Sequence, residues 1–153
     1  MELRRVRISD PDVEPLLSGL ADEYRRRYGE QDELSSVPDV EFDPPSGLFL
    51  IAVEAGEVVA GGGFRYLETG VSEVKRMWTR DDRRRRGLAS ALLLALEAAA
   101  QEVGYKTLRL ETGPAQPEAA ALYEQRGYQR IPVFGRYQQA LAFEVDLASA
   151  GPG

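Results

Sequence analysis

The chain has 153 residues, of which 43% are hydrophobic and 29% are charged, and its formal net charge is −6. This length suits one domain with a hydrophobic core, and the negative total argues against a general nucleic-acid binder, which usually carries a basic face. Because the sequence has neither cysteine nor histidine, it excludes disulfides, thiol nucleophiles, a Ser-His-Asp triad and histidine-ligated zinc, so acid–base chemistry must fall to Glu, Asp, Tyr, Lys, a terminus or water.

The first predicted elements are a strand and a helix. Residues 3–8 alternate between apolar and charged side chains, which is typical of a half-buried strand. Ser9 or Asp10 can cap the following helix, with Pro11 at its first position. Apolar residues then recur at helical spacing, and the helix is expected to end near Gly29.

A loop and a strand pair follow. Residues 31–47 are polar and contain prolines, which predicts a long loop, and loops of this length in compact domains are often functional. Residues 48–54 and 58–66 predict two paired strands joined by a turn at 55–57. The three consecutive glycines at 61–63 indicate a bulge or a close backbone approach rather than a phosphate site.

The next strand is predicted over residues 72–79. Side chains alternate in a regular strand, and this alternation divides the segment into two faces. One face is expected to carry Glu73, Lys75, Met77 and Thr79, and the other Val74, Arg76 and Trp78.

A basic loop then leads into a long helix. Arginines occupy positions 83–86, Gly87 follows, and helical apolar spacing predicts a helix over 88–103. The free amides and the dipole at a helix start favour an anion. Gly87 lets the backbone approach a ligand closely, and guanidinium groups present forked donors suited to phosphate. This turn therefore predicts a phosphate-bearing ligand.

The remaining elements complete an α/β pattern. They are a strand over 107–111, a helix over 117–126, and strands over 128–133 and 141–147. Helices alternating with strands predict a mixed sheet with helices on its faces. Residues 148–153 are expected to form a flexible tail, which leaves 1–147 as a single domain.

No segment predicts membrane insertion. The N-terminal residues lack the apolar core of a signal peptide. The longest apolar run, around residues 88–100, contains Ser90 and Glu97 and is too short to span a bilayer. We therefore expect a cytoplasmic protein with no membrane partner.

Two stretches resemble the motifs of the GCN5-related N-acetyltransferase (GNAT) superfamily. Residues 74–79 and the loop after them resemble motif A, whose loop reads Gln/Arg-x-x-Gly-x-Gly/Ala and is filled here by Arg84, Gly87 and Ala89. Residues 117–128 resemble motif B, a helix ending in Leu-Tyr-x-x-x-Gly-Phe/Tyr. Both motifs occur in the expected order and cover roughly the latter half of the chain.

The resemblance implies a fold and a cosubstrate. The fold is a mixed, mostly antiparallel sheet of about six or seven strands, flanked by helices and splayed at its two central parallel strands. Acetyl-CoA is implied to lie in that opening, with its pyrophosphate on the loop amides and its pantetheine arm along the motif A strand, and no metal is implied. The residues implied to bind it are Met77, Trp78, Thr79, Arg84, Arg85, Arg86, Gly87, Leu88, Ala89 and Tyr123.

The resemblance also implies acetyl transfer to a primary amine. It gives Tyr123 the role of general acid towards the departing thiolate, although the same tyrosine could only pack the helix on the sheet. Glu73, acting through water, and Glu111 are the two candidates for the base, and each could equally be an ordinary ion-paired carboxylate. The main-chain N–H of Met77 is implied as the oxyanion donor. Because there is no cysteine, a covalent acetyl-thioenzyme is excluded and direct transfer in a ternary complex is expected.

The acceptor is less defined than the cosubstrate. Loops at 43–47 and 132–137 are expected to flank its cleft, and loop packing is an equal alternative for their side chains. The candidate substrate-binding residues are Arg76, Glu111, Phe134 and Tyr137. The partner is expected to be a small-molecule amine or a protein amine, and the net negative charge suits a cationic one.

Two other functions remain as alternatives for this sequence. An acyl-CoA-binding sensor or interaction module would keep the cofactor site without efficient catalysis, but binding alone does not require Tyr123. A nucleotide-phosphate binder is disfavoured because the basic loop lacks the Gly-Lys-Ser/Thr ending of P-loop proteins. The family resemblance allows a homodimer.

Overall fold

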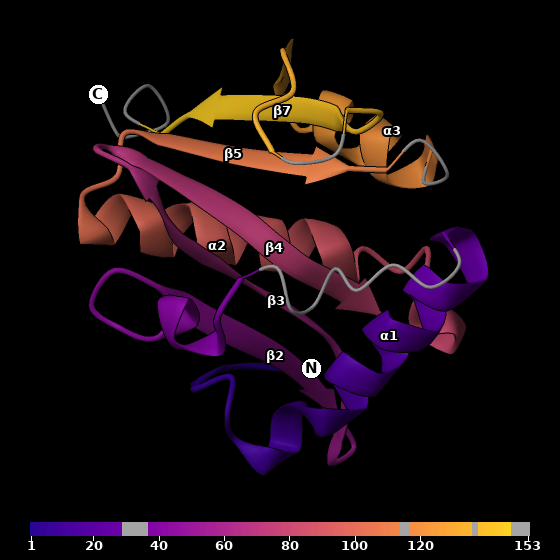
Figure 1. Ribbon diagram of the computed structural model, residues 1–153. Helices are drawn as coiled ribbons and strands as arrows, with labels where there is room; N and C mark the ends of the chain where they lie inside the picture. Colours follow the sequence, from indigo (N-terminus) through magenta and orange to yellow (C-terminus); the bar gives the residue numbers. More distant parts are fainter. Residues whose placement is uncertain (29–36, 114–116, 136–137, 148–153) are drawn as a thin grey trace.

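The computed structural model describes residues 1–28, 37–113, 117–135 and 138–147 (Figure 1). Within them the strands are β1 Glu2–Val6, β2 Leu48–Glu54, β3 Glu57–Glu68, β4 Val71–Thr79, β5 Thr107–Thr112, β6 Gln129–Ile131 and β7 Leu141–Asp146, the helices are α1 Glu14–Tyr28, α2 Leu88–Val103 and α3 Pro117–Gln125, and the 3-10 turns are η1 Pro11–Val13, η3 Asp39–Phe42 and η4 Asp81–Arg83. The described strands form one seven-stranded sheet in the order β1-β2-β3-β4-β5-β7-β6. Only β4 and β5 pair in parallel, and every other neighbour pair in this sheet is antiparallel. The predicted fold class is confirmed.

The helices cover the sheet on both faces. Side chains of α2 and α3 join one hydrophobic cluster with β2, β3, β4, β5 and β7, while side chains of α1 join a second cluster with η3, β2 and β3. In Figure 1, α2 runs behind the sheet and α1 lies across its front. Helix α2 buries Leu88, Leu92, Leu96 and Ala99 as predicted, but Val103 at its end is exposed. No helix of the described residues is long and apolar enough to cross a membrane.

The N-terminal half follows local sequence signals. The β2–β3 turn contains Ala55 and Gly56, both with left-handed φ values of 51° and 79°, as a tight hairpin with a right-handed strand twist requires. The backbone N–H of Asp12 donates to Asp10 Oδ1 at 2.8 Å, and Asp10 caps the turn that leads into α1.

The central parallel strands separate after a short contact. Residues 71–73 of β4 pair with residues 107–109 of β5, but β4 continues to Thr79 and β5 to Thr112 without further mutual pairing. Figure 1 shows the two strands diverging towards their carboxyl ends. Among the described residues, β4 and β5 therefore do not pair with each other beyond residues 73 and 109, and the predicted splay is confirmed.

A β-bulge lies in β4 beside this opening. The pairing register between β3 and β4 shifts between Gly61 and Gly63, and Arg76 has a left-handed φ of 62°. A Cβ on Gly62 would lie 2.4 Å from Met77 Sδ, so glycine there admits the Met77 side chain. The predicted close packing at the three glycines is confirmed, whereas the extra residue of the bulge lies in the facing strand β4.

Because of the bulge, the side chains of β4 do not occupy the faces that strict alternation predicts. Val74 and Met77 both pack against the α2-side cluster, whereas Trp78 packs against the α1-side cluster. Glu73 pairs with Arg65 of β3 and precedes Val74, which pairs with Phe64. Because neighbouring side chains in a strand point to opposite faces and Val74 faces α2, Glu73 lies on the α1 side. The prediction that Glu73 shares a face with Met77 is therefore wrong, because an inserted residue breaks the two-residue alternation.

Candidate active site

A cavity of about 780 Å³ opens where β4 and β5 separate. It is bounded by α1, the carboxyl-terminal halves of β4 and β5, the loop before α2, the start of α2, and α3. Of the residues predicted to bind the cofactor, it is lined by Met77, Trp78, Thr79, Arg84, Arg85, Gly87, Leu88, Ala89 and Tyr123. The structure thus brings all of that set together around one space except Arg86, which is not among the lining residues.

The loop before α2 turns through two left-handed residues. Arg85 has φ 64° and Gly87 has φ 79°. Gly87 directly precedes α2 and offers no side chain to cap the first amides of the helix, which leaves these donors for a ligand. A Cβ at Gly87 would meet nothing within 4 Å. The backbone conformation, rather than a lack of space, therefore favours glycine at this position.

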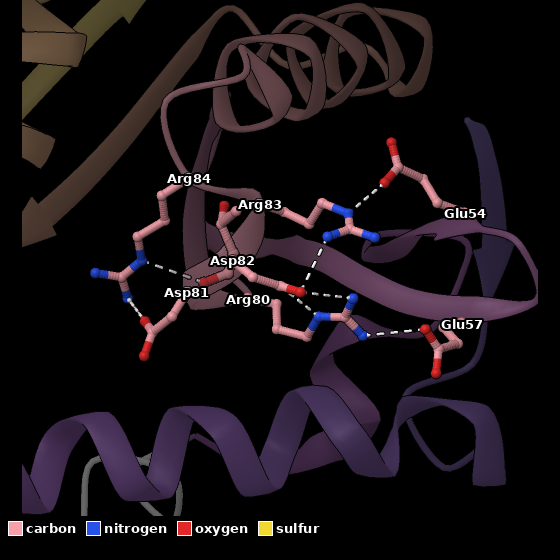
Figure 2. A network of polar contacts seen from close by, with 8 residues as sticks. Glu54, Glu57, Arg80, Asp81, Asp82, Arg83 and Arg84 are labelled. Atoms are coloured by element: carbon pink, nitrogen blue, oxygen red, sulfur yellow. Dashed lines mark hydrogen bonds and ion pairs between the residues drawn. The ribbon is translucent and has the colours of Figure 1, made fainter.

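Arg83 belongs to a network that ties the loop to the β2–β3 hairpin. Its Nε donates to Glu54 Oε1 at 2.7 Å and its Nη1 to Asp82 Oδ2 at 2.9 Å. Arg80 donates to Asp82 at 2.7 Å and to Glu57 at 3.4 Å, so the carboxylates and guanidinium groups alternate (Figure 2). Hydrogen bonds from Arg83 and Arg80 lower the pKa values of Glu54 and Asp82, respectively, below their ordinary values.

Arg84 ties the same loop to α1. Its Nη2 donates to Oε1 of Glu23, a carboxylate of α1 that is only 5% exposed. Its Nε donates to the main-chain oxygen of Thr79 at 3.4 Å, and Nη2 lies 3.2 Å from Asp81 Oδ1. Glu23 and Arg84 both line the cavity, so this ion pair joins two of its walls.

Arg85 and Arg86 differ from the arginines before them. Both side chains are exposed, and neither makes a hydrogen bond or ion pair with any residue that the structure describes. Arg85 lines the cavity, whereas Arg86, the next residue in the sequence, is not among the lining residues. The run of four arginines thus divides into two that hold the protein together and two that face solvent.

Tyr123 is buried among aromatic rings on α3. It is 6% exposed, and its ring centroid lies 5.8 Å from that of Tyr128 and 5.6 Å from that of Phe143. Burial raises the pKa of Tyr123 to about 12. Tyr128 is itself fixed, because its hydroxyl donates to Glu97 Oε2 of α2 at 2.8 Å. Tyr123 also lines the cavity, and this pKa keeps its phenol neutral at neutral pH.

Glu73 is held in an ion pair next to the cavity. Its Oε1 accepts a hydrogen bond from Arg65 Nη1 at 2.7 Å, and its Oε2 lies 3.7 Å from Lys75 Nζ. Lys75 lines the cavity, whereas Glu73 is 5% exposed and is not among the lining residues. The carboxylate therefore meets the cavity only through its cationic partner.

Arg76 is committed to the segment around η3. Its guanidinium donates to Asp39 Oδ1 at 2.8 Å and to the main-chain oxygen of Val37 at 2.9 Å, and lies 4.9 Å from the centroid of the Phe42 ring. Parts of Arg76 line the cavity, but these contacts direct its charged group into the protein. The structure thus shows Arg76 anchoring one edge of the α1 side.

Of the other residues expected to bind the acceptor, Glu111 lines the cavity and Phe134 does not. Glu111 lines the cavity, and its Oε2 accepts hydrogen bonds from the backbone N–H groups of Phe134 and Gly135 at 3.1 and 3.0 Å. The Phe134 ring lies 5.6 Å from the guanidinium carbon of Arg109 and is not among the lining residues. Tyr137 lies outside the described residues. Glu111 therefore anchors the loop that was expected to flank the acceptor.

Sequence reasoning missed the wall that α1 contributes. Glu23 and Tyr24 line the cavity, while the loop at 43–47 that was expected to flank it does not. Tyr24 ends the apolar stripe of its helix, which was a signal that it faces inward. Nothing in the sequence pairs Glu23 with Arg84, because 61 positions separate them.

Comparison with known proteins places these features in a family. The model described as "Acetyltransferase (GNAT) family" matches residues 16–128. YjgM of Escherichia coli (strain K12), an uncharacterized N-acetyltransferase, is 36% identical over 103 residues, and the match spans 65% of this chain but only 59% of that protein.

Solved structures share the fold over nearly the whole chain. A Klebsiella pneumoniae protein, a candidate acyl-CoA N-acyltransferase, is 31% identical with a TM-score of 0.79, covering 95% of this chain and 97% of its own. PaiA N-acetyltransferase from Thermoplasma acidophilum, solved with coenzyme A, is 15% identical with a TM-score of 0.75, covering 95% and 99%. The chain belongs to the acetyltransferase (GNAT) family.

Proposed function

We propose that this protein is an acetyl-CoA-dependent N-acetyltransferase that moves the acetyl group to a primary amine by direct attack in a ternary complex. The observation that carries the proposal is the cavity between the splayed strands, which joins the start of α2 to Tyr123 in one space. Family membership supports it, as does the bound coenzyme A of the Thermoplasma relative, which shares the fold.

The residues around the cavity fit acetyl-CoA. Left-handed Gly87 and the uncapped amides of α2 suit a pyrophosphate. Residues 77–79 of β4 face the opening with backbone groups that an amide-containing pantetheine arm can pair. The volume of about 780 Å³ lies in the usual range for small-molecule sites. We assign residues 84–89 to the pyrophosphate and residues 77–79 to the pantetheine.

In the proposed reaction the amine gains the acetyl group and loses one proton. The amine nitrogen attacks the thioester carbon, the C–N bond forms, and the C–S bond breaks as the electron pair returns to sulfur. We assign the main-chain N–H of Met77, beside the bulge, to the developing oxyanion. The amine loses one proton and the thiol gains one, so the step balances without a redox partner.

Tyr123 is the proposed acid for the departing sulfur. Its pKa of about 12 keeps the phenol protonated throughout the physiological range. An ordinary thiol has a pKa of about 8.5, so complete transfer from this phenol to a free thiolate is uphill. Tyr123 therefore acts by donating a hydrogen bond while charge develops on sulfur, and any tyrosinate formed quickly recovers a proton from the amine side.

The base is one of two carboxylates. Glu111 lines the cavity; its Oε2 accepts the hydrogen bonds from the loop amides, and its Oε1 packs beside Gly135. Glu73 is held by Arg65 and Lys75 and would act on the amine only through water. Because Glu73 is not among the residues that line the cavity and Glu111 is, Glu111 is the better placed acceptor of the proton.

Two measurements test the proposal. Titration calorimetry with acetyl-CoA should show saturable binding, and release of the CoA thiol should exceed background with at least one amine from a panel of polyamines, aminoglycosides, amino acids and lysine peptides. Absence of acetyl-CoA binding overturns the proposal. Binding with background thiol release for the whole panel would instead favour an acyl-CoA sensor.

A further inference from the structure

We propose that Glu23 of α1 is a positioning residue for the acceptor amine. Its ion pair with Arg84 fixes the part of α1 in which Tyr24 forms a wall of the cavity, so Glu23 acts through Tyr24 rather than on the amine itself. The inference rests on the proposed function, because it concerns the acceptor of the same reaction. It adds a determinant of acceptor binding on α1, outside both sequence motifs.

The proposed base places the acceptor amine on the α1 side of the sheet. Leu108 and Leu110 of β5 pack in the α2-side cluster, so Glu111, which follows Leu110 in the strand, points to the α1 side. Tyr24 packs against the α1-side cluster, and both Tyr24 and Glu111 line the cavity. An amine that gives its proton to Glu111 therefore lies on the same side of the sheet as Tyr24.

Two contacts hold α1 against the end of β4. A Cβ at Gly19 would overlap the Trp78 indole, so glycine at this position lets the helix lie directly on that ring. Glu23 lies about one helical turn further along α1 and accepts a hydrogen bond from Nη2 of Arg84. Because Arg84 Nε donates to the main-chain oxygen of Thr79 at 3.4 Å, this second contact also leads to β4. In Figure 1 the carboxyl end of β4 points towards α1.

The burial of Glu23 indicates that the second contact is a fixed one. Its side chain is 7% exposed, whereas that of Asp22, the residue before it, is 61% exposed. A carboxylate is costly to bury, and a cationic partner offsets that cost. Arg84 is such a partner, so Glu23 strongly favours the position in which the two groups meet. Tyr24 is the next residue, and its place in the cavity wall follows from this ion pair.

The test separates the position of the Glu23 carboxyl oxygen from its charge. Glu23→Gln removes the charge but leaves an oxygen at the same reach that still accepts from Arg84, so the KM for the acceptor should stay within about threefold. Glu23→Asp keeps the charge but withdraws it by one methylene, so this KM should rise about fivefold to tenfold. In both variants kcat should change by less than about threefold and the acetyl-CoA affinity by less than about twofold, because Tyr123 and the first amides of α2 are untouched. Thiol release with the amine from the panel that releases the most thiol measures KM and kcat, and titration calorimetry measures the affinity.

A double substitution tests whether Glu23 acts through Tyr24. Tyr24→Ala removes the wall itself and should raise the KM for the acceptor about tenfold. Adding Glu23→Asp to Tyr24→Ala should raise it further by less than about twofold, since no side chain remains to be positioned.

Asp22→Ala is the matched control on the same helix. It removes a neighbouring carboxylate, but Asp22 pairs with Arg25 on the surface of α1, so the KM for the acceptor should stay within about twofold. Thermal melts confirm that each variant is folded.

Three results would overturn this inference alone, because in each of them the unmodified protein still transfers acetyl groups. The first is a rise in the KM for the acceptor that is no larger in Glu23→Asp than in Glu23→Gln. The second is an effect of Glu23→Asp that multiplies with that of Tyr24→Ala, and the third is a loss of acetyl-CoA affinity as large as the rise in KM. An unmodified protein that releases no thiol above background overturns the proposed function and this inference together.

Discussion

At the scale of single residues, Tyr123 is defined by what surrounds its phenol. The rings of Tyr128 and Phe143 pack around it, and burial raises its pKa to about 12. We predict that Tyr123→Phe lowers kcat about 100-fold with little change in acetyl-CoA affinity, because only the donor to sulfur is lost. Steady-state thiol release and calorimetry measure the two quantities.

The pH profile gives a second check on Tyr123. A phenol with a pKa of about 12 remains protonated through pH 10, so loss of the acid form should not reduce the rate between roughly pH 8 and pH 10. An alkaline limb that lies in this interval and disappears in Tyr123→Phe would contradict the environment described here.

The same substitution can be made at Glu111 and Glu73, the two candidate bases, and the resulting activities compared. We predict that Glu111→Gln lowers kcat/KM at least about tenfold at neutral pH, because Glu111 lines the cavity. Glu73→Gln should lower kcat/KM less, since Glu73 is bound to Arg65 and Lys75. A larger loss of kcat/KM in Glu73→Gln than in Glu111→Gln, measured by thiol release, would reverse the assignment.

At the scale of elements, the turn into α2 depends on the conformation of Gly87. We predict that Gly87→Asp weakens acetyl-CoA binding at least about tenfold, whereas Gly87→Asn weakens it only a few fold. Asn and Asp tolerate left-handed φ similarly, and open space surrounds a Cβ there, so charge is the main difference between the variants. Calorimetry measures both affinities.

Salt provides the control for the Gly87 variants. Repulsion between an exposed Asp carboxylate and phosphate is screened as ionic strength rises, so the difference between Gly87→Asp and Gly87→Asn should narrow. Equal affinities at low salt would show that the anion does not lie at this turn.

The elements themselves were largely predictable, whereas the bulge in β4 had consequences that alternation could not supply. The strand at 72–79 was predicted from its pattern, and the glycines at 61–63 indicated an irregularity in its neighbour. The pattern did not show that the extra residue falls at Arg76, because that depends on the pairing of β3 with β4. Met77 and Trp78, which follow the bulge, therefore lie on the opposite faces from those that alternation with Val74 predicts.

At the scale of the whole molecule, buried tyrosines couple stability to alkaline pH. The folded state holds the Tyr123 proton with a pKa of about 12, against an ordinary value of 10.0. Between these values the unfolded state has lost a proton that the folded state retains, so the free energy of unfolding falls as pH rises. The contribution of Tyr123 is about 2 to 3 kcal/mol, fully present below pH 10 and lost towards pH 12.

Chemical denaturation at several pH values tests this coupling. We predict that stability decreases from about pH 10 to about pH 12 and that Tyr123→Phe has a shallower decrease. Burial and the nearby Glu97 carboxylate also raise the pKa of Tyr128, so part of the decrease should remain in that variant. Identical slopes in the two proteins would contradict the burial of Tyr123.

The sequence by itself determined what depends on neighbours in the chain: the periodicity of the helices and strands, the basic turn before α2, and two motifs that resemble the GNAT superfamily. Only the tertiary structure decided which arginines are neutralised by the protein, which face Glu73 occupies, and how deeply Tyr123 is buried. The pairing of Arg84 with Glu23 joins residues 61 positions apart, and such contacts arise only after the helices pack on the twisted sheet. Local propensity acts over a few residues, whereas charge pairing and desolvation depend on distances in space, which is why the site's electrostatics could not be read from the sequence.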